Sequence, residues 1–429
     1  HRDLHSFPTR RSSDLFGELD PLSGGKVQVI TVEDARDQAA AFVAEAKRIR
    51  EIAPGTPWSG IAVLAREHGT LAPIRAACER CGIPAAWTIH RGGAPPALHR
   101  IREIAEGMDR IRARGKDILS ASRIEKMLEE AGVLSPPGDA NPWCNLLREI
   151  LASWREETAD APLPASQALE AVYDALAERR REQRVGDGVF FGTVHGAKGM
   201  EFPHVFLCDG GWRTERDAAG MEEERRAFYV GMTRARNSLC IFRRSDVRNP
   251  HLPLLDGDYR LDRNNSAASD VRRALAPELL RVRYEMLGLK DILIGYAGRC
   301  AENAPIHRQL AALQPGSRLS MRAMKNGGVE LADSAGSVVA RLSQAAAERW
   351  RKRLHLVREV RVIGMIRREK KDESEEYRNS RRSERWEIPW LEVVWEELEA
   401  RDAIAPPVPR HEAIAAAALA ERAVQRHGG

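Results

Sequence analysis

The chain has 429 residues, of which 43% are hydrophobic and 30% are charged. This composition describes a globular chain of about two to four domains and excludes a disordered or fibrous protein. The longest apolar runs, such as 413–420, are far shorter than the roughly 20 residues that span a bilayer, so we expect no membrane partner. The formal net charge of +5 is compatible with a polyanionic partner.

The cysteine pattern and the first residues limit the interpretation further. Only one CxxC occurs, at Cys78 and Cys81, and no second pair completes a zinc site. We therefore expect reduced thiols, no metal site and a cytoplasmic protein. Residues 1–15 (HRDLHSFPTRRSSDL) lack an initiator Met and resemble a translated sequencing adapter. We expect this segment to be non-native and the chain to be a truncated gene product.

Strands and helices alternate in the first predicted domain. The expected order is strand, helix, strand, helix, strand, at 27–32, 34–50, 60–65, 71–81 and 83–87. Alternation at this spacing predicts an α/β unit with a parallel sheet. We assign residues 16–90 to the first part of this domain.

A helical pattern with few strand signals interrupts the domain over 91–187. Strand signals return afterwards, and the expected elements are strands at 189–194, 204–209 and 238–243 and a helix over 221–236. Because the sheet begins before the helical block and ends after it, we predict a helical insertion within one domain that 188–246 completes.

Residues 247–429 predict a small α+β extension of unknown role. A long helix is expected over 267–286, followed by short strands and a second helix. The dense mixed-charge run 367–387 is typical of a solvated loop.

The segment GTVHGAKGMEFPHVFL, residues 192–207, carries the clearest chemistry. Thr193, His195, Lys198 and Glu201 lie in a loop between two predicted strands, and α/β proteins place ligands at such sheet edges. Glycines at 196 and 199 would let backbone amides approach a phosphate, and Lys198 adds positive charge. From spacing alone, a ligand-binding loop and an ordinary strand–turn–strand connection both remain open.

A second segment, EEERRAFYVGMTRAR at 222–236, predicts an amphipathic helix with arginines near both ends. By itself it is best interpreted as a surface helix whose first arginines pair with Glu222–Glu224. Arg234 and Arg236 cluster near the end of this helix. A second interpretation is therefore that this end faces an anion.

Together the two segments resemble motifs V and VI of UvrD/Rep-type superfamily 1 DNA helicases, T-x-H-x-A-K-G-x-E-F and E-E-E-R-R-x-x-Y-V-x-x-T-R-A. The matching residues are Thr193, His195, Ala197, Lys198, Gly199, Glu201, Phe202, Glu222–Arg226, Tyr229, Val230, Thr233, Arg234 and Ala235. The stretch from Gly60 to Arg66 resembles motif IV of the same family. The resemblance covers roughly residues 26–245 and implies a second RecA-like domain of the P-loop NTPase type.

The resemblance also implies roles for individual residues. Arg66 and Arg234 would act as arginine fingers on the γ-phosphate of ATP, and we expect both at the sheet edge that faces the nucleotide. Glu201 would hydrogen-bond the ribose, with Gly199 beside the nucleotide. Thr193, His195 and Lys198 would contact single-stranded DNA or a single-strand/duplex junction. Translocation from 3′ to 5′, a part in DNA repair and a bacterial-type, nucleoid-associated location are implied by the family alone. The insertion takes the place of the family's 2B domain.

No G-x-x-x-x-G-K-[ST] motif occurs in the sequence, and no acidic strand of the Walker B type precedes residue 26. We therefore expect the first RecA-like domain, with the ligands of Mg²⁺, to belong to a missing N-terminal half. The chain alone should then lack ATP hydrolysis.

Two other functions remain open. A helicase–nuclease fragment would carry an Asp-Tyr-Lys-like triplet, and the nearest match is Asp258-Tyr259-Arg260 without the surrounding pattern. A non-catalytic nucleic-acid-binding module could keep the helicase fold, although it would have no use for Arg66, Glu201 and Arg234 together.

Overall fold

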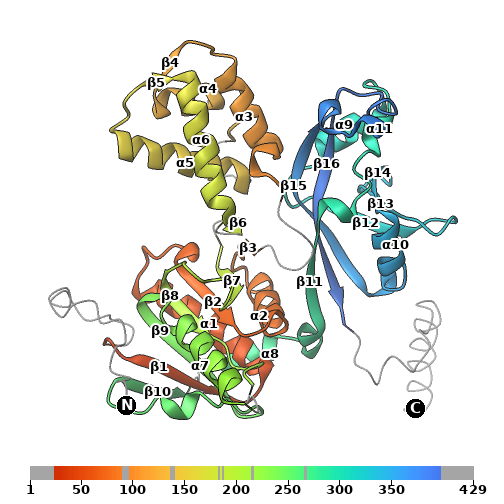
Figure 1. The fold of residues 1–429 in the computed structure, drawn as a ribbon. Coiled ribbons are helices and arrows are strands. Elements are labelled where there is room, and N and C mark those ends of the chain that lie inside the picture. The colour runs from red at the N-terminus through yellow and green to blue at the C-terminus, as the bar shows by residue number, and fades with distance from the viewer. Residues whose placement is uncertain are drawn as a thin grey trace, which may run out of the picture.

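The computed structural model describes residues 24–88, 96–135, 141–181, 184–185, 188–213, 217–264 and 268–397. The segment 1–15, expected to be non-native, lies outside these ranges. Figure 1 shows three parts: a parallel-sheet domain, a helical insertion beside it, and a C-terminal module that lies next to both. Within the described ranges, no helix combines the length and the apolar character needed to cross a bilayer.

The first domain is built on a six-stranded sheet in which every neighbouring pair of strands is parallel. In spatial order its strands are β10 (Arg260–Asn264), β1 (Val27–Val32), β9 (Ala235–Arg244), β8 (Phe202–Leu207), β2 (Ile61–Ala65) and β7 (Phe190–Thr193). The predicted α/β class with a parallel sheet is confirmed.

Helices cover both faces of this sheet. On one face lie α1 (Ala35–Ile52) and α2 (His68–Arg80), where the Asp34 side chain accepts a hydrogen bond from the Asp37 amide and caps α1. On the other face lies α7 (Ala218–Met232). The strands are buried on both faces, which is why they read as continuous apolar runs rather than alternating ones.

The sheet extends beyond residue 246, where the sequence predicted the domain to end. Its edge strand β10 pairs with β1, and α8 (Ala268–Ala274) packs on α1. The predicted helix over 267–286 is wrong, because Ala276 is extended before Pro277 and the chain continues as a short 3-10 helix (Pro277–Arg281). We propose that the domain ends near residue 281.

The insertion leaves the sheet through a short antiparallel ribbon of β3 (Trp87–Thr88) and β6 (Arg184–Val185). Its helices are α3 (Arg102–Arg112), α4 (Ala121–Glu130), α5 (Pro142–Thr158) and α6 (Ala165–Arg181), with β4 (Ile118–Leu119) paired to β5 (Leu163–Pro164). In the predicted strand at 83–87, Ala85 forms only an isolated bridge to Val189.

The C-terminal module is an antiparallel sheet with short helices, which confirms the predicted α+β character. Its strands in spatial order are β11 (Val282–Leu287), β16 (Arg385–Glu396), β15 (Val357–Glu369), β12 (Arg318–Ala323), β13 (Val329–Ala332) and β14 (Val338–Arg341). Its helices are α9 (Pro305–Ala312), α10 (Gln344–Arg351) and α11 (Glu375–Arg378). The 367–387 run is not wholly solvated, because Glu373 and Arg381 form a buried ion pair within it.

The insertion and the module share one hydrophobic core. The indole N–H of Trp143 on α5 donates to the carbonyl oxygen of Ile363 on β15 at 2.8 Å. A Cβ on Gly364 would lie 2.6 Å from the Trp143 Nε1, so only glycine allows this approach. The insertion is therefore packed against the module rather than free in solvent.

Candidate nucleotide and nucleic-acid site

The predicted site residues lie on one loop, one strand end and one helix of the parallel-sheet domain. The loop 194–201 leaves the carboxyl end of β7 and returns to the amino end of β8. Val194 and Ala197 are buried on the sheet face, whereas His195, Lys198 and Glu201 are exposed. The two buried residues hold the loop to the sheet and leave its polar side chains in solvent.

Thr193 shapes the start of this loop. Its hydroxyl oxygen accepts a hydrogen bond from the amide of Gly196 at 3.1 Å, and its carbonyl accepts from the amide of Ala197 at 3.0 Å. Gly199 has a φ of +87°, a left-handed conformation that glycine adopts without strain. Among the described residues, His195 and Lys198 have no ion-pair partner, so both side chains are available to a ligand.

Helix α7 carries the second motif close against the first. A Cβ on Gly231 would lie 2.9 Å from the Val194 side chain and 3.0 Å from that of Leu207, so glycine permits the close packing of helix and sheet. The predicted pairing at the start of the helix is confirmed for Glu222. Hydrogen bonds from Arg225 and Arg226 lower the pKa of Glu222 to about 2.

Arg234 lies just after α7, between the helix and β9, and not inside the helix predicted over 221–236. Its guanidinium donates to the carbonyl oxygens of Val230 and Met200, both at 3.1 Å, and to the hydroxyl of Thr233 at 2.9 Å. The two carbonyls tie Arg234 to the end of the helix and to the end of the loop. Its guanidinium therefore lies at the peptide that joins Met200 to Glu201, the predicted ribose contact.

Glu201 is not free in this conformation. Its carboxylate accepts a hydrogen bond from Arg236 at 2.9 Å, and both side chains are about half exposed. The pairing of Glu201 with Arg236 was not predicted, because the motif pattern ends at Ala235. An ion pair this exposed is weak and can open for a ligand.

Arg66 follows β2 and is bound to Glu224 of α7. Its guanidinium makes three hydrogen bonds to the carboxylate, the shortest 2.6 Å. Burial by itself would raise the pKa of Glu224, but the hydrogen bonds from Arg66 lower it. The same contact raises the pKa of Arg66. The side chain of Glu224 is only 5% exposed, so it holds Arg66 at a fixed place on the sheet edge.

Arg66 and Arg234 lie at opposite ends of the parallel strands, so the expectation that both occupy one sheet edge is wrong in this conformation. Arg66 follows the carboxyl end of β2, and Arg234 precedes the amino end of β9. The physical reason is that α7 runs back along the sheet. From Glu224 to Met232 it spans about 12 Å at 1.5 Å per residue.

Comparison with known proteins finds a family match within this chain. Residues 118–245 match the family described as the UvrD-like helicase C-terminal domain. This part of the chain is similar to the UvrD-like helicase C-terminal domain. The match confirms the predicted resemblance to UvrD/Rep-type helicases.

Several curated relatives of this chain are named as DNA helicases. UvrD2 of Mycobacterium tuberculosis is 31% identical over 221 residues, which cover 49% of this chain and 31% of the relative. PcrA of Bacillus subtilis is 44% identical over 99 residues, covering 21% of this chain and 13% of PcrA. DNA helicase II of Haemophilus influenzae is 46% identical over 55 residues, covering 11% and 8%. The chain thus spans about a third or less of the length of these relatives.

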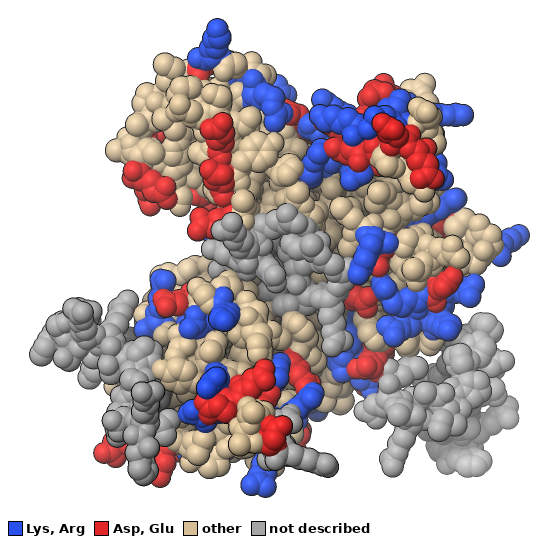
Figure 2. All heavy atoms as spheres, in the orientation of Figure 1, with Lys and Arg blue, Asp and Glu red and all other residues tan. Residues whose placement is uncertain are grey.

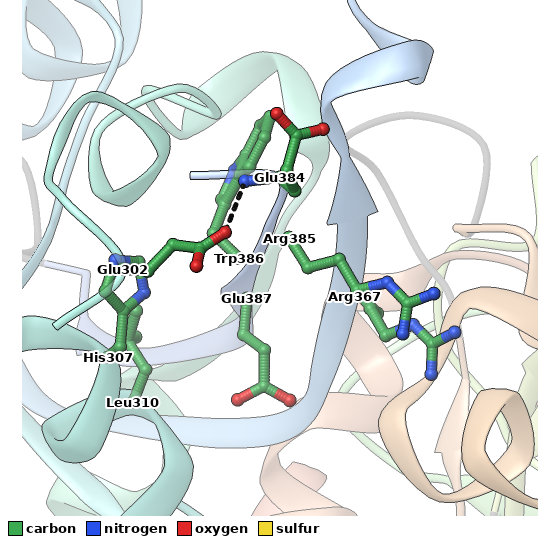
Figure 3. Close-up of a pocket in the computed structure, with 8 residues that line it drawn as sticks. All are labelled: Glu302, His307, Leu310, Arg367, Glu384, Arg385, Trp386 and Glu387. Carbon is green, nitrogen blue, oxygen red and sulfur yellow. Dashed lines mark hydrogen bonds between the residues drawn. The ribbon is translucent and has the colours of Figure 1, made fainter. Parts of the chain in front are cut away.

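A hollow outside the matched residues 118–245 lies on the C-terminal module (Figure 3). It has a volume of about 350 Å³, and Glu302 and His307 lie across it from the first residues of β16. Its charges are largely matched, since Glu387 pairs with Arg102 and Arg367 pairs with Asp109. No predicted site residue lines this hollow.

Proposed function

We propose that this chain supplies the second RecA-like half of an ATP-dependent DNA helicase or translocase. In this proposal Arg234 and Arg66 are the arginine fingers, Glu201 with Gly199 holds the nucleoside, and Thr193, His195 and Lys198 contact single-stranded DNA. The ATP phosphates and Mg²⁺ would be held by a first RecA-like domain. No segment of this sequence resembles that domain. Translocation from 3′ to 5′ is part of the same proposal.

The observation that carries the proposal is the course of the loop 194–201. It begins next to Thr193, the proposed DNA contact, and ends at Glu201 beside Arg234, the proposed nucleotide contacts. Buried Val194 and Ala197 make the loop part of the domain core. A shift of Arg234 toward a nucleotide would therefore displace the carbonyl of Met200 and the loop that bears the DNA contacts.

The donor and acceptor groups suit a nucleotide. Glu201 offers a half-exposed carboxylate, which can accept from ribose hydroxyls, and Arg234 offers a planar guanidinium that matches a phosphate. An arginine that reaches the γ-phosphate only after domain closure stabilises the transition state more than the ground state. For Arg66 to do this, it must first leave Glu224.

The test uses the chain joined to a first RecA-like domain with an intact phosphate-binding loop. Arg234→Ala should lower the rate of ATP turnover by roughly 10³-fold or more, with a much smaller effect on nucleotide affinity. Arg236→Ala should change nucleotide affinity, because it leaves the carboxylate of Glu201 without its ion-pair partner. Arg226→Ala is the control, since this arginine is 75% exposed and pairs only with Glu222 among the described residues. Normal turnover by Arg234→Ala would refute the arginine-finger role.

A further inference from the structure

A hollow of about 800 Å³ separates the parallel-sheet domain from the C-terminal module. From the sheet domain it is lined by Arg66 and Thr193 at the carboxyl edge, and from the module by Lys290, Arg349 and Trp395. Thr193 is a proposed DNA contact, so the hollow begins where a bound strand would lie. Ordinary small-molecule pockets are mostly apolar, whereas charged residues dominate this lining.

The charged lining residues are six basic and three acidic ones: Arg66, Arg75, Arg213, Arg283, Lys290 and Arg349 against Glu67, Glu285 and Glu397. Every one of the five arginines already has a carboxylate partner. Lys290 is exposed and has no such partner among the described residues. The unbalanced positive charge of the lining is therefore on the module side.

The same side continues onto α10. Arg349 joins this helix to Asp291, next to Lys290, and to Glu285 of β11. Arg351 and Lys352 follow at the end of the helix, both exposed and, within the described residues, without a carboxylate partner. Figure 2 shows Lys and Arg side chains gathered on the module where Figure 1 places α10. We call Lys290, Arg351 and Lys352 the α10 patch.

Trp395 connects the hollow to the patch. Its ring packs edge-on against Trp350 of α10 at 6.3 Å, and the guanidinium of Arg353 lies 4.9 Å from its centre. Its indole N–H is buried and has no hydrogen-bond partner in the described structure. A buried donor without a partner is costly unless water or a ligand accepts its hydrogen bond. The Trp395 side chain lines the hollow that the patch extends.

We propose that the hollow and the α10 patch bind the sugar–phosphate backbone of the single strand whose neighbouring segment lies on Thr193 and His195. This proposal rests on the proposed function and gives the C-terminal module a role in it. Lysine and arginine side chains without carboxylate partners bind phosphates by releasing counterions, without regard to sequence. The ring of Trp395 is already covered by Arg353, so we assign it no base-stacking role.

The test measures fluorescence anisotropy of labelled oligothymidylates of about 5 and about 20 nucleotides, lengths that bracket common single-strand site sizes. The patch variant carries Lys290→Glu, Arg351→Glu and Lys352→Glu in the full chain. Its affinity for the longer oligonucleotide should fall about tenfold or more, and the slope of log K against log salt should drop by about 2. Affinity for the shorter one should stay close to that of the unaltered chain.

The matched control carries Lys47→Glu, Lys116→Glu and Lys126→Glu, which makes the same change in net charge at exposed lysines outside the hollow. Equal affinities of the patch and control variants for the longer oligonucleotide would overturn the inference. The variant His195→Ala distinguishes a failure of the α10-patch inference from a failure of the proposed function. If His195→Ala weakens binding while the patch variant matches the control, only the inference falls. If the unaltered chain binds neither oligonucleotide, the proposed DNA contact falls as well.

Discussion

Arg66 and Glu224 join the end of strand β2 to helix α7 through three hydrogen bonds between residues 158 positions apart in the sequence. Glu224 is almost fully buried, and Arg66 keeps about a quarter of its side chain exposed. The contact holds one proposed arginine finger away from Arg234. Closure on a nucleotide would therefore have to exchange this carboxylate for a phosphate.

Glu224→Ala should lower the free energy of unfolding at neutral pH by about 1–2 kcal/mol, because a charge-assisted bond is lost in a partly exposed setting. Glu223→Ala is the control, since this neighbour is exposed. Chemical denaturation of both variants gives the comparison. An equal loss for both would contradict the special role of Glu224.

The same pair predicts a pH dependence. The pKa of Glu224 in the folded chain is below its ordinary value of 4.5, so the pair contributes its full stability above that value. The contribution is lost as the pH falls from 4.5 through the lowered pKa. The difference in unfolding free energy between the unaltered chain and Glu224→Ala should thus shrink over this acidic range. A difference that stays constant down to pH 3 would contradict the ion pair.

Arg75 of α2 and Glu392 of β16 form a buried ion pair between the parallel-sheet domain and the module, with two hydrogen bonds of 2.7 Å. Arg75→Leu should cost about 3 kcal/mol of unfolding free energy, because Glu392 is left charged and only 1% exposed. Adding Glu392→Leu should recover much of the loss, and a double-mutant cycle measures the coupling. Additive losses would show that the two residues act independently.

Gly364→Ala should weaken the packing of the insertion on the module, because the added methyl would lie 2.6 Å from the Trp143 indole nitrogen. We expect a loss of about 1–3 kcal/mol in unfolding free energy. Gly55→Ala is the control, since a Cβ there meets nothing within 4 Å. Thermal unfolding of both variants tests this, and an unchanged midpoint for Gly364→Ala would mean that the shared core tolerates the change.

The chain by itself should release no phosphate from ATP, with or without single-stranded DNA, since its sequence has no phosphate-binding loop. A phosphate-release assay on residues 16–429 measures this, and the chain joined to a first RecA-like domain serves as the positive control. DNA-stimulated hydrolysis by residues 16–429 would show that the phosphates are held by residues that we have not assigned.

The sequence by itself determined the parallel α/β class, the helical insertion and the two motif segments. Each of these depends on local patterns: apolar runs for buried strands, and glycines with charged residues at fixed spacing for the 192–207 loop. The loop and the helix α7 could therefore be predicted within a few residues. The helix predicted over 267–286 does not form as one helix, because Pro277 interrupts the apolar pattern that predicted it.

Only the tertiary structure decided which residues meet. The sequence contains no signal that Arg66 bonds Glu224, that Arg236 bonds Glu201, or that Trp143 packs on Gly364, 221 positions further along the chain. Such contacts follow from the order of strands in the sheet and the direction in which α7 crosses it. For the same reason, Arg66 and Arg234 lie in segments that resemble motifs of one family, yet they stand at opposite ends of parallel strands.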